Sequence, residues 1–203
     1  MCLVSILKIP CLIREVTMVG LIHRMLLEFL DELLDAAAVA RIRARANIPA
    51  DTMFRIAQNY SDEEFRTLLT CIMEETGLDR DVLETRFASH FLKDAKARWP
   101  MWFDMSTSAR ELLLRQPKIH NGFASSMRSE ADRTRINDKF LVYEDEQGIT
   151  VHYKSPNQLC VLYKALAQEV IDDYGEQATI TESLCLKKGD AKCCIRVEWP
   201  APQ

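Results

Sequence analysis

Four residues in the last third of the chain are of the chemical types that bind metal ions. They are Cys160, Glu182, Cys185 and Cys193, and the last two flank a Lys-Lys-Gly-Asp turn. This order predicts a β-hairpin with a cysteine on each arm, which brings two thiols together. Three thiolates and one carboxylate are acceptable ligands for a tetrahedral Zn²⁺ ion. The alternative is ordinary packing, because free cysteine is among the most buried residue types.

The other cysteines indicate a reducing environment. Seven cysteines are an odd number for a disulfide framework, and a chain of 203 residues does not need disulfides to fold. The sequence therefore favours a cytoplasmic protein. Cys71 falls on the apolar face of a predicted helix and is expected in the core, whereas Cys194 points to the opposite strand face from Cys193. Cys2 and Cys11 lie in an N-terminal stretch whose membership of the native protein is left open.

Length and charge narrow the class of protein. With 203 residues, 48% of them hydrophobic and 28% charged, one globular domain is the default expectation. The net charge of −4 argues against a nucleic-acid binder, which needs a concentrated basic face. No apolar run is long enough for a membrane span. We expect residues 1–17 to be an extension and Met18 to be the natural first residue of a single domain, 18–203.

Helical periodicity dominates the first two thirds of the chain. Apolar residues from Leu21 to Leu33 recur at helical spacing, and Ser61 followed by three acids is a typical helix start. A late helix contains Pro117 and presents His120 about one turn downstream, whether the proline kinks the helix or starts a new one. Helices are expected at about 19–34, 36–46, 61–76, 79–98 and 108–120, with a further short segment at 52–58 and a solvated helix or loop at 125–138.

The apolar period then changes from 3.6 to 2 residues. Alternating runs at 140–143 and 149–153 predict one hairpin, and runs at 178–186 and 192–199 predict a second, with a helix at 159–174 between them. The predicted fold class is therefore α+β, with a helical part at about 18–138. An α/β part at about 139–199 holds a four-stranded antiparallel sheet with one inserted helix.

Three features together resemble a known family. Tyr153-x-Ser155 stands at the exit of the second strand, His120 lies late in a preceding helix, and Met18-Val-Gly-Leu-Ile resembles the family's usual opening. The pattern is similar to the haem nitric oxide/oxygen binding (H-NOX) family, sensor domains related to the haem domain of soluble guanylate cyclase. The resemblance covers about Met18 to Trp199.

The resemblance implies a haem b cofactor. His120 would be the proximal iron ligand, and a neutral imidazole on a helix suits that role. Tyr153 and Ser155 match the family's propionate-binding motif, but Asn157 stands where the family has an arginine. An amide cannot replace the bidentate contacts of an arginine with a carboxylate. The family's proline after the histidine has no obvious counterpart between Arg133 and Asp138 either.

The same resemblance also implies which residues line the gas-binding side of the haem and which residues bind a metal ion. The position of the family's distal tyrosine falls on Leu162, or on Tyr163 with a one-residue shift. With Ile22 and Leu26, Leu162 would line an apolar pocket that favours nitric oxide over oxygen. A zinc-containing subset of the family carries a metal site similar in spacing to Cys160, Glu182, Cys185 and Cys193, with a histidine at the position of Glu182.

Three functions remain open from the sequence. The first is a haem-based nitric oxide sensor that reports to a separate histidine kinase or cyclic-nucleotide enzyme, with a homodimer left open. The second is a haem-free sensor for a small organic or lipid-like ligand in the same cavity, and the third is a zinc-thiolate redox switch. No enzyme signature is present. We expect structural roles for His23, His90 and His152, and core positions for the aromatic cluster Trp99, Trp102 and Phe103.

Overall fold

The computed structural model describes residues 17–125, 127 and 129–201. Residues 1–16 of the predicted extension, including Cys2 and Cys11, lie outside the described residues, whereas Thr17 belongs to a strand. No helix in the described part is both long and apolar enough to cross a membrane.

Three helices form one side of the molecule: α1 (Gly20–Leu33), α2 (Ala36–Arg45) and α3 (Asp62–Thr76). Helix α1 begins at Gly20, and a glycine is needed there because a Cβ would lie 2.4 Å from the Arg55 carbonyl oxygen. Helix α3 begins where Ser61 accepts a hydrogen bond from the Glu63 amide, 3.1 Å away, and it ends at Gly77 with a φ of 67°. The predicted ends of α1 and α3 are confirmed to within about one residue.

A small two-stranded sheet lies beside these helices, and the sequence did not predict it. It pairs β1 (Thr17–Val19) with β2 (Asn59–Ser61), so that Met18 faces Tyr60. Strands of three residues are too short to show a period. The predicted short segment at 52–58 is neither helix nor strand, and that expectation is wrong.

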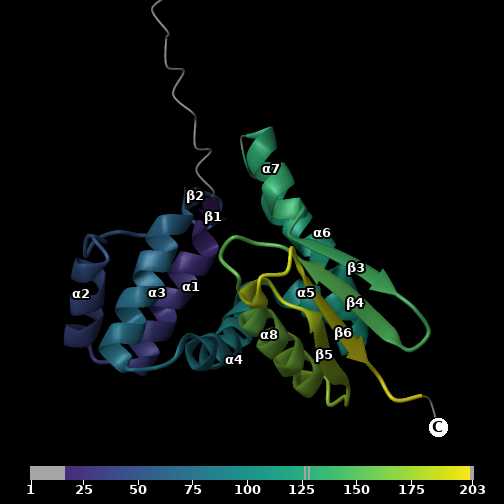
Figure 1. Cartoon of the computed structure of the whole chain (residues 1–203). Coiled ribbons are helices and arrows are strands. Elements are labelled where there is room, and N and C mark those ends of the chain that lie inside the picture. Colours follow the sequence, from purple (N-terminus) through teal and green to yellow (C-terminus); the bar gives the residue numbers. More distant parts are fainter. Residues whose placement is uncertain (1–16, 126, 128, 202–203) are drawn as a thin grey trace, which may run out of the picture.

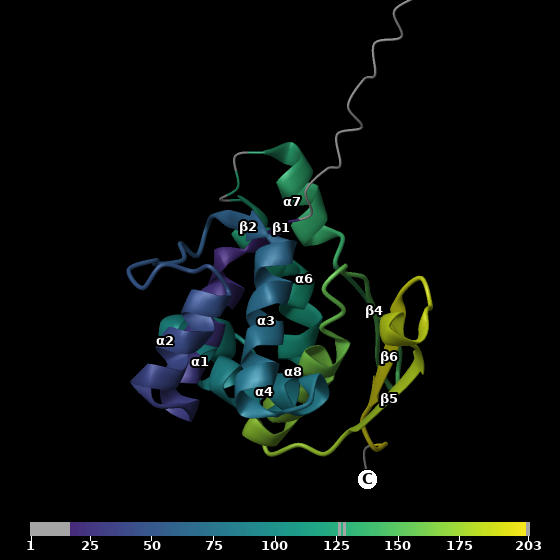
Figure 2. The same ribbon diagram turned by 60° about the vertical axis from the view of Figure 1, so that its left-hand side comes forward.

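Four further helices lead to the main sheet: α4 (Arg80–Arg98), α5 (Pro100–Asp104), α6 (Ala109–Ser125) and α7 (Glu130–Asn137). Helix α6 continues through Pro117, so His120 lies on the same helix as Leu112. Helix α7 carries mostly polar residues, as expected for a solvated helix, and stands out from the rest in Figures 1 and 2.

The main sheet is antiparallel with strand order β3-β4-β6-β5. Its strands are β3 (Phe140–Glu144), β4 (Gly148–Tyr153), β5 (Thr179–Leu184) and β6 (Cys193–Glu198), and helix α8 (Cys160–Asp173) is inserted between β4 and β5. Figure 1 shows α1–α3 on one side, the sheet on the other, and α4 with α8 between them. Figure 2 keeps this arrangement from a second direction. The α+β fold with a helical N-terminal part and a four-stranded antiparallel sheet is confirmed.

Candidate functional site

A largely apolar cavity lies where α1, α4, α6, α8 and the main sheet meet. Its volume is about 240 Å³. Helix α1 contributes Leu21 and Ile22, and α8 contributes Leu162, Leu166 and Ala167. The polar side chains that line the cavity come from other elements. Helix α6 contributes Gln116 and His120, and the residues in and next to strands β3 and β4 contribute Lys139, Tyr153 and Ser155.

His120 presents its imidazole to this cavity. The ring packs edge-on against Phe140, with 4.7 Å between the ring centroids. No described residue forms a hydrogen bond with either ring nitrogen. Burial, together with the nearby charge of Lys139, lowers the pKa of His120 to about 4. The imidazole is therefore neutral at pH 7, with a lone pair free to coordinate a metal.

An aromatic cluster forms part of the same cavity wall. Trp99, Trp102 and Phe103 all line the cavity, together with Phe123 of α6. The two indoles stack with 4.9 Å between their ring centroids, and Phe123 meets both edge-on at 5.5 Å. Trp99 and Phe103 pack against the hydrophobic core as expected, and all three rings also line the cavity, which was not expected. Pro100 starts the short helix α5, and this change of chain direction places the rings beside the cavity.

The Tyr-x-Ser-x-Asn motif is divided between the cavity and the protein interior. Tyr153 and Ser155 line the cavity, but Asn157 does not. The Asn157 side-chain amide donates to Asp62 Oδ1 at 2.6 Å, and its oxygen accepts from Arg66 at 3.4 Å. Arg80 donates to the Asn157 carbonyl oxygen. Asn157 therefore links the loop after β4 to α3 and α4.

Only some of the residues that were expected to line the gas-binding side of the pocket reach the cavity. Ile22 and Leu162 line the cavity, whereas Leu26 is fully buried in the helical core and is not among the lining residues. Tyr163 also lines the cavity, and its hydroxyl has no hydrogen-bond partner among the described residues. Its ring packs on Phe140 at 5.4 Å, the same ring that contacts His120.

Lys139 is a cavity residue that the sequence did not single out. It directly precedes β3, and strand alternation would have placed it on the opposite side from the buried Phe140. The turn between α7 and β3 brings it to the cavity instead. No sequence signal could have shown this, because the path of that turn depends on how α7 packs.

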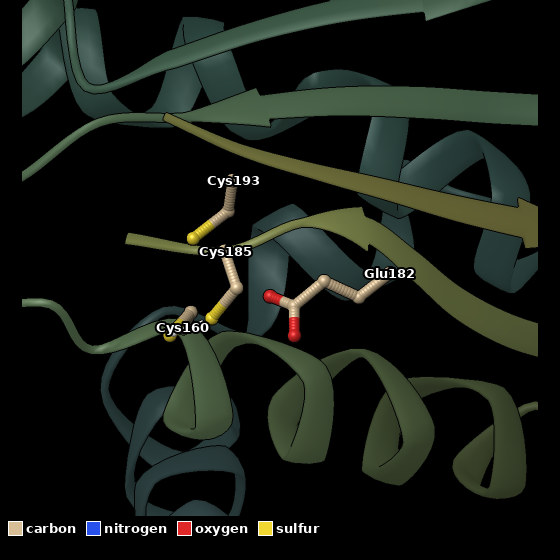
Figure 3. Close-up of side chains that lie close together, drawn as sticks. All are labelled: Cys160, Glu182, Cys185 and Cys193. Carbon is tan, nitrogen blue, oxygen red and sulfur yellow. Dashed lines mark hydrogen bonds between the residues drawn. The ribbon is translucent and has the colours of Figure 1, made fainter. Parts of the chain in front are cut away.

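The four predicted metal ligands come together at the start of α8. The ligand atoms of Cys160, Glu182, Cys185 and Cys193 all lie within 4.8 Å of one another. Figure 3 shows Cys160 at the first turn of α8 and the other three on the β5–β6 hairpin, with the side chains directed toward a common centre. Gly189, with a φ of 94°, allows the tight turn between Cys185 and Cys193. This cluster could hold a metal ion.

The geometry and chemistry of the cluster fit such an ion. Two sulfurs bound to one tetrahedral Zn²⁺ lie about 3.8 Å apart, and the Cys160 and Cys185 sulfurs are 3.7 Å apart. One carboxylate oxygen of Glu182 accepts a hydrogen bond from the Lys164 ammonium at 2.8 Å. The other carboxylate oxygen is buried and has no hydrogen-bond partner in the described chain. Burial and the thiols of Cys193 and Cys185 raise the pKa of Cys160 to about 12. A bound cation would offset both costs.

The remaining histidines lie away from the cavity and the cluster. His23 is fully buried and stacks on Phe54, with ring centroids 4.7 Å apart. His90 Nδ1 lies 3.1 Å from a Glu32 oxygen, and His152 Nδ1 lies 3.0 Å from the Lys192 ammonium. Cys194 lies beside His152 across the strands and is not part of the cluster.

His23 predicts a pH dependence of stability. Burial lowers the pKa of His23 to about 4, against 6.5 for the free side chain. Between these values the unfolded chain takes up a proton that the folded chain does not, so the free energy of unfolding falls as the pH is lowered. The expected loss is about 3 kcal/mol from pH 7 to pH 4. Denaturant unfolding at several pH values should show a flatter profile for His23→Leu than for the wild type; equal slopes would contradict the assignment.

Comparisons with known proteins agree with this arrangement. The model of the haem-NO-binding family matches residues 19–182. No curated protein matches the chain. An H-NOX protein from S. oneidensis in the Fe(II)NO ligation state has 15% identity and a TM-score of 0.74, covering 90% of this chain and 99% of that one. An oxygen-binding H-NOX domain related to soluble guanylate cyclases has 15% identity and a TM-score of 0.75, covering 91% and 96%.

A third structure, an Fe(II) unliganded H-NOX mutant from K. algicida, has 17% identity and a TM-score of 0.67, covering 90% of this chain and 97% of that one. At these identities the structures show the fold alone. The family match covers most of the chain, and it includes the helices around the cavity, Tyr153, Ser155 and two of the four cluster residues. The chain belongs to the haem-NO-binding family.

Proposed function

We propose that this chain is a haem-based nitric oxide sensor in which His120 is the axial ligand of the iron. The observation that carries the proposal is the neutral His120 imidazole, without a hydrogen-bond partner in the described chain, at the wall of an apolar cavity. The chain belongs to the haem-NO-binding family, and a neutral histidine on a helix suits the role of an axial ligand of haem iron. Bound haem would supply an iron centre that binds diatomic gases.

The cavity residues support a preference for nitric oxide. Leu21 and Ile22 of α1 and Leu162 and Leu166 of α8 carry no hydrogen-bond donor in their side chains. The Tyr163 hydroxyl is the exception, and its ring packs with Phe140 on the wall that holds His120. The four aliphatic side chains offer no hydrogen bond to bound oxygen, which needs one more than nitric oxide does, so the Tyr163 hydroxyl is the α8 donor on which oxygen binding would depend.

The fold suggests how the signal would leave the site. Helix α6 carries His120, and Phe123 of the same helix packs on the stacked indoles of Trp99 and Trp102. A change at His120 would therefore move an element that already contacts α5 and the residue that joins α5 to α4. We propose that the chain acts as one domain, 18–203, in the cytoplasm, and that a separate histidine kinase or cyclic-nucleotide enzyme detects this movement.

One experiment tests the haem and the metal together. The full chain is expressed with added haem precursor, and its absorption spectrum, iron and zinc contents are measured. The expected result is a Soret band with about one haem and one zinc per chain. Protein without Soret absorption, even after reconstitution with haem, would contradict the haem proposal.

A second candidate, a haem-free sensor of a small apolar ligand, is favoured by the size of the cavity. A volume of about 240 Å³ is just below the range of about 300–1,000 Å³ that is typical for small-molecule sites. Haem would have to widen the space between α1, α6 and α8, whereas a smaller ligand would not. An apolar ligand found by native mass spectrometry in protein purified without haem would favour this candidate.

For the second site we propose a structural zinc ion held by Cys160, Glu182, Cys185 and Cys193. Such an ion would tie the first turn of α8 to the β5–β6 hairpin. The three thiols are buried, and reactive cysteines are typically accessible with lowered pKa values. This burial supports a structural role over a redox switch.

A further inference from the structure

Lys139 places a cation in an otherwise apolar cavity. Of the described residues that line the cavity, it is the only lysine, and no arginine accompanies it. No described residue accepts a hydrogen bond from its ammonium group or forms an ion pair with it. Lys139 is half-buried, and an ammonium group that loses water on the way into a cavity is costly unless an anion compensates it. The arrangement is therefore incomplete without a negatively charged partner.

The nearest protein anion does not fill this role. Asp62 attracts the Lys139 ammonium electrostatically, but the two groups form no ion pair. The Asn157 amide donates to Asp62 Oδ1 at 2.6 Å, and Asp62 Oδ2 has no hydrogen-bond partner in the described chain, so the Asp62 carboxylate is held by Asn157 and not by Lys139. Burial accordingly lowers the pKa of Lys139, as expected for an ammonium that lacks a close counterion.

The position of Lys139 gives the cavity one polar end. Its carbonyl oxygen accepts a hydrogen bond from the Lys154 amide at 3.0 Å, and the next residue, Phe140, pairs with Tyr153. Lys139 thus lies beside the segment that carries Tyr153 and Ser155, both of which also line the cavity. These adjoining segments therefore supply the cavity with an ammonium and two hydroxyl groups. The Tyr153 hydroxyl oxygen accepts a hydrogen bond from the Leu159 amide at 3.1 Å and the Ser155 hydroxyl oxygen accepts one from the Asn157 amide at 3.3 Å, and each hydroxyl keeps a proton to donate.

We infer that the cavity takes a ligand with an apolar body and a terminal carboxylate, and that Lys139 binds this carboxylate with help from the Tyr153 and Ser155 hydroxyls. For haem, which carries two carboxylates, the inference rests on the proposed function. For an acyl-chain carboxylate it stands without haem. Arg66 and Arg80 do not compete for this role, because they hold Asn157 and do not line the cavity.

The test compares free carboxylates with their esters. The full chain is titrated with haem and with haem dimethyl ester, followed by Soret absorption. It is also titrated with decanoic acid and with methyl decanoate, followed by tryptophan fluorescence, to which Trp99 and Trp102 of the cavity wall contribute. The wild type is expected to prefer each acid over its ester about 10- to 100-fold, the size of a hydrogen bond to a charged group. Lys139→Met should bind each acid and its ester with nearly equal affinity, whereas Lys139→Arg should retain most of the preference for the acid.

Lys154→Met is the matched control. Lys154 is exposed, lies next to Lys139 in space and does not line the cavity, so its loss should leave the preference unchanged. An unchanged preference in Lys139→Met, or no preference in the wild type in either pair, would overturn the inference. If the wild type binds no haem but prefers decanoic acid in a Lys139-dependent way, the haem proposal fails and the inference stands.

Discussion

His120→Ala is expected to lose the iron–histidine bond and most of its haem affinity. The imidazole faces the cavity and has no hydrogen-bond partner in the described chain, so its loss removes a ligand without disturbing a polar network. Loss of an outer-shell partner of a metal ligand already costs about 10- to 100-fold in affinity, and loss of the ligand itself should exceed that range. The measurements are haem titration, iron content and the position of the Soret band, followed by the addition of free imidazole.

Free imidazole should restore a histidine-like spectrum in His120→Ala, because the truncated side chain leaves space beside Phe140. His152→Ala is the matched control, since His152 lies on β4 with the Lys192 ammonium as its partner and does not line the cavity. It should bind haem like the wild type. A His120→Ala protein with an unchanged spectrum and affinity would show that another residue holds the iron.

The second large effect is expected at the metal cluster. Cys185→Ser should remove one of three thiolates from the site and with it most of the bound zinc. A ligand present at 1,000 times its dissociation constant stabilises the folded state by about 4 kcal/mol, so the variant should lose a comparable amount. For a domain of this size that loss corresponds to about 8–16 °C in melting temperature. Zinc analysis and thermal unfolding, each with and without chelator, measure the two effects.

Cys194→Ser separates the metal from the general cost of losing a thiol. Cys194 is the neighbour of Cys193 on the same strand, faces the other way and is half-buried beside His152. Its replacement should leave zinc content and melting temperature close to the wild-type values. Chelator should lower the melting temperature of the wild type and of Cys194→Ser, but not that of Cys185→Ser. Equal zinc contents in all three proteins would contradict the proposed ligand set.

Much of the fold could be predicted because burial leaves a period in the sequence. The apolar stripe of α1, the serine that begins α3 and the glycine that ends it gave correct boundaries. The change to a period of two residues predicted the four main strands, and the return to a helical pattern between the two hairpins predicted the inserted helix. The Lys-Lys-Gly-Asp turn likewise brought Cys185 and Cys193 together, because a hairpin places its two arms side by side, whereas Cys160 reaches them through the packing of α8 beside the hairpin.

The cavity depended on tertiary structure. Periodicity tells which face of an element is apolar, but not whether that face meets another side chain or an open space. Leu26 and Ile22 share the apolar face of α1, yet only Ile22 reaches the cavity. Trp99 and Trp102 looked like core residues for the same reason.

The polar end of the cavity was decided by contacts between distant segments. Asn157 turns away because Asp62, 95 residues earlier in the chain, accepts its amide, and no local pattern could show that pairing. Lys139 enters through the turn between α7 and β3, whose path depends on how those elements pack. The sequence by itself therefore determined the helices, the strands and the pairing of Cys185 with Cys193 across a hairpin, which rest on local spacing. Only the tertiary structure decided which side chains a cavity ligand would meet, since those contacts join residues far apart in the chain.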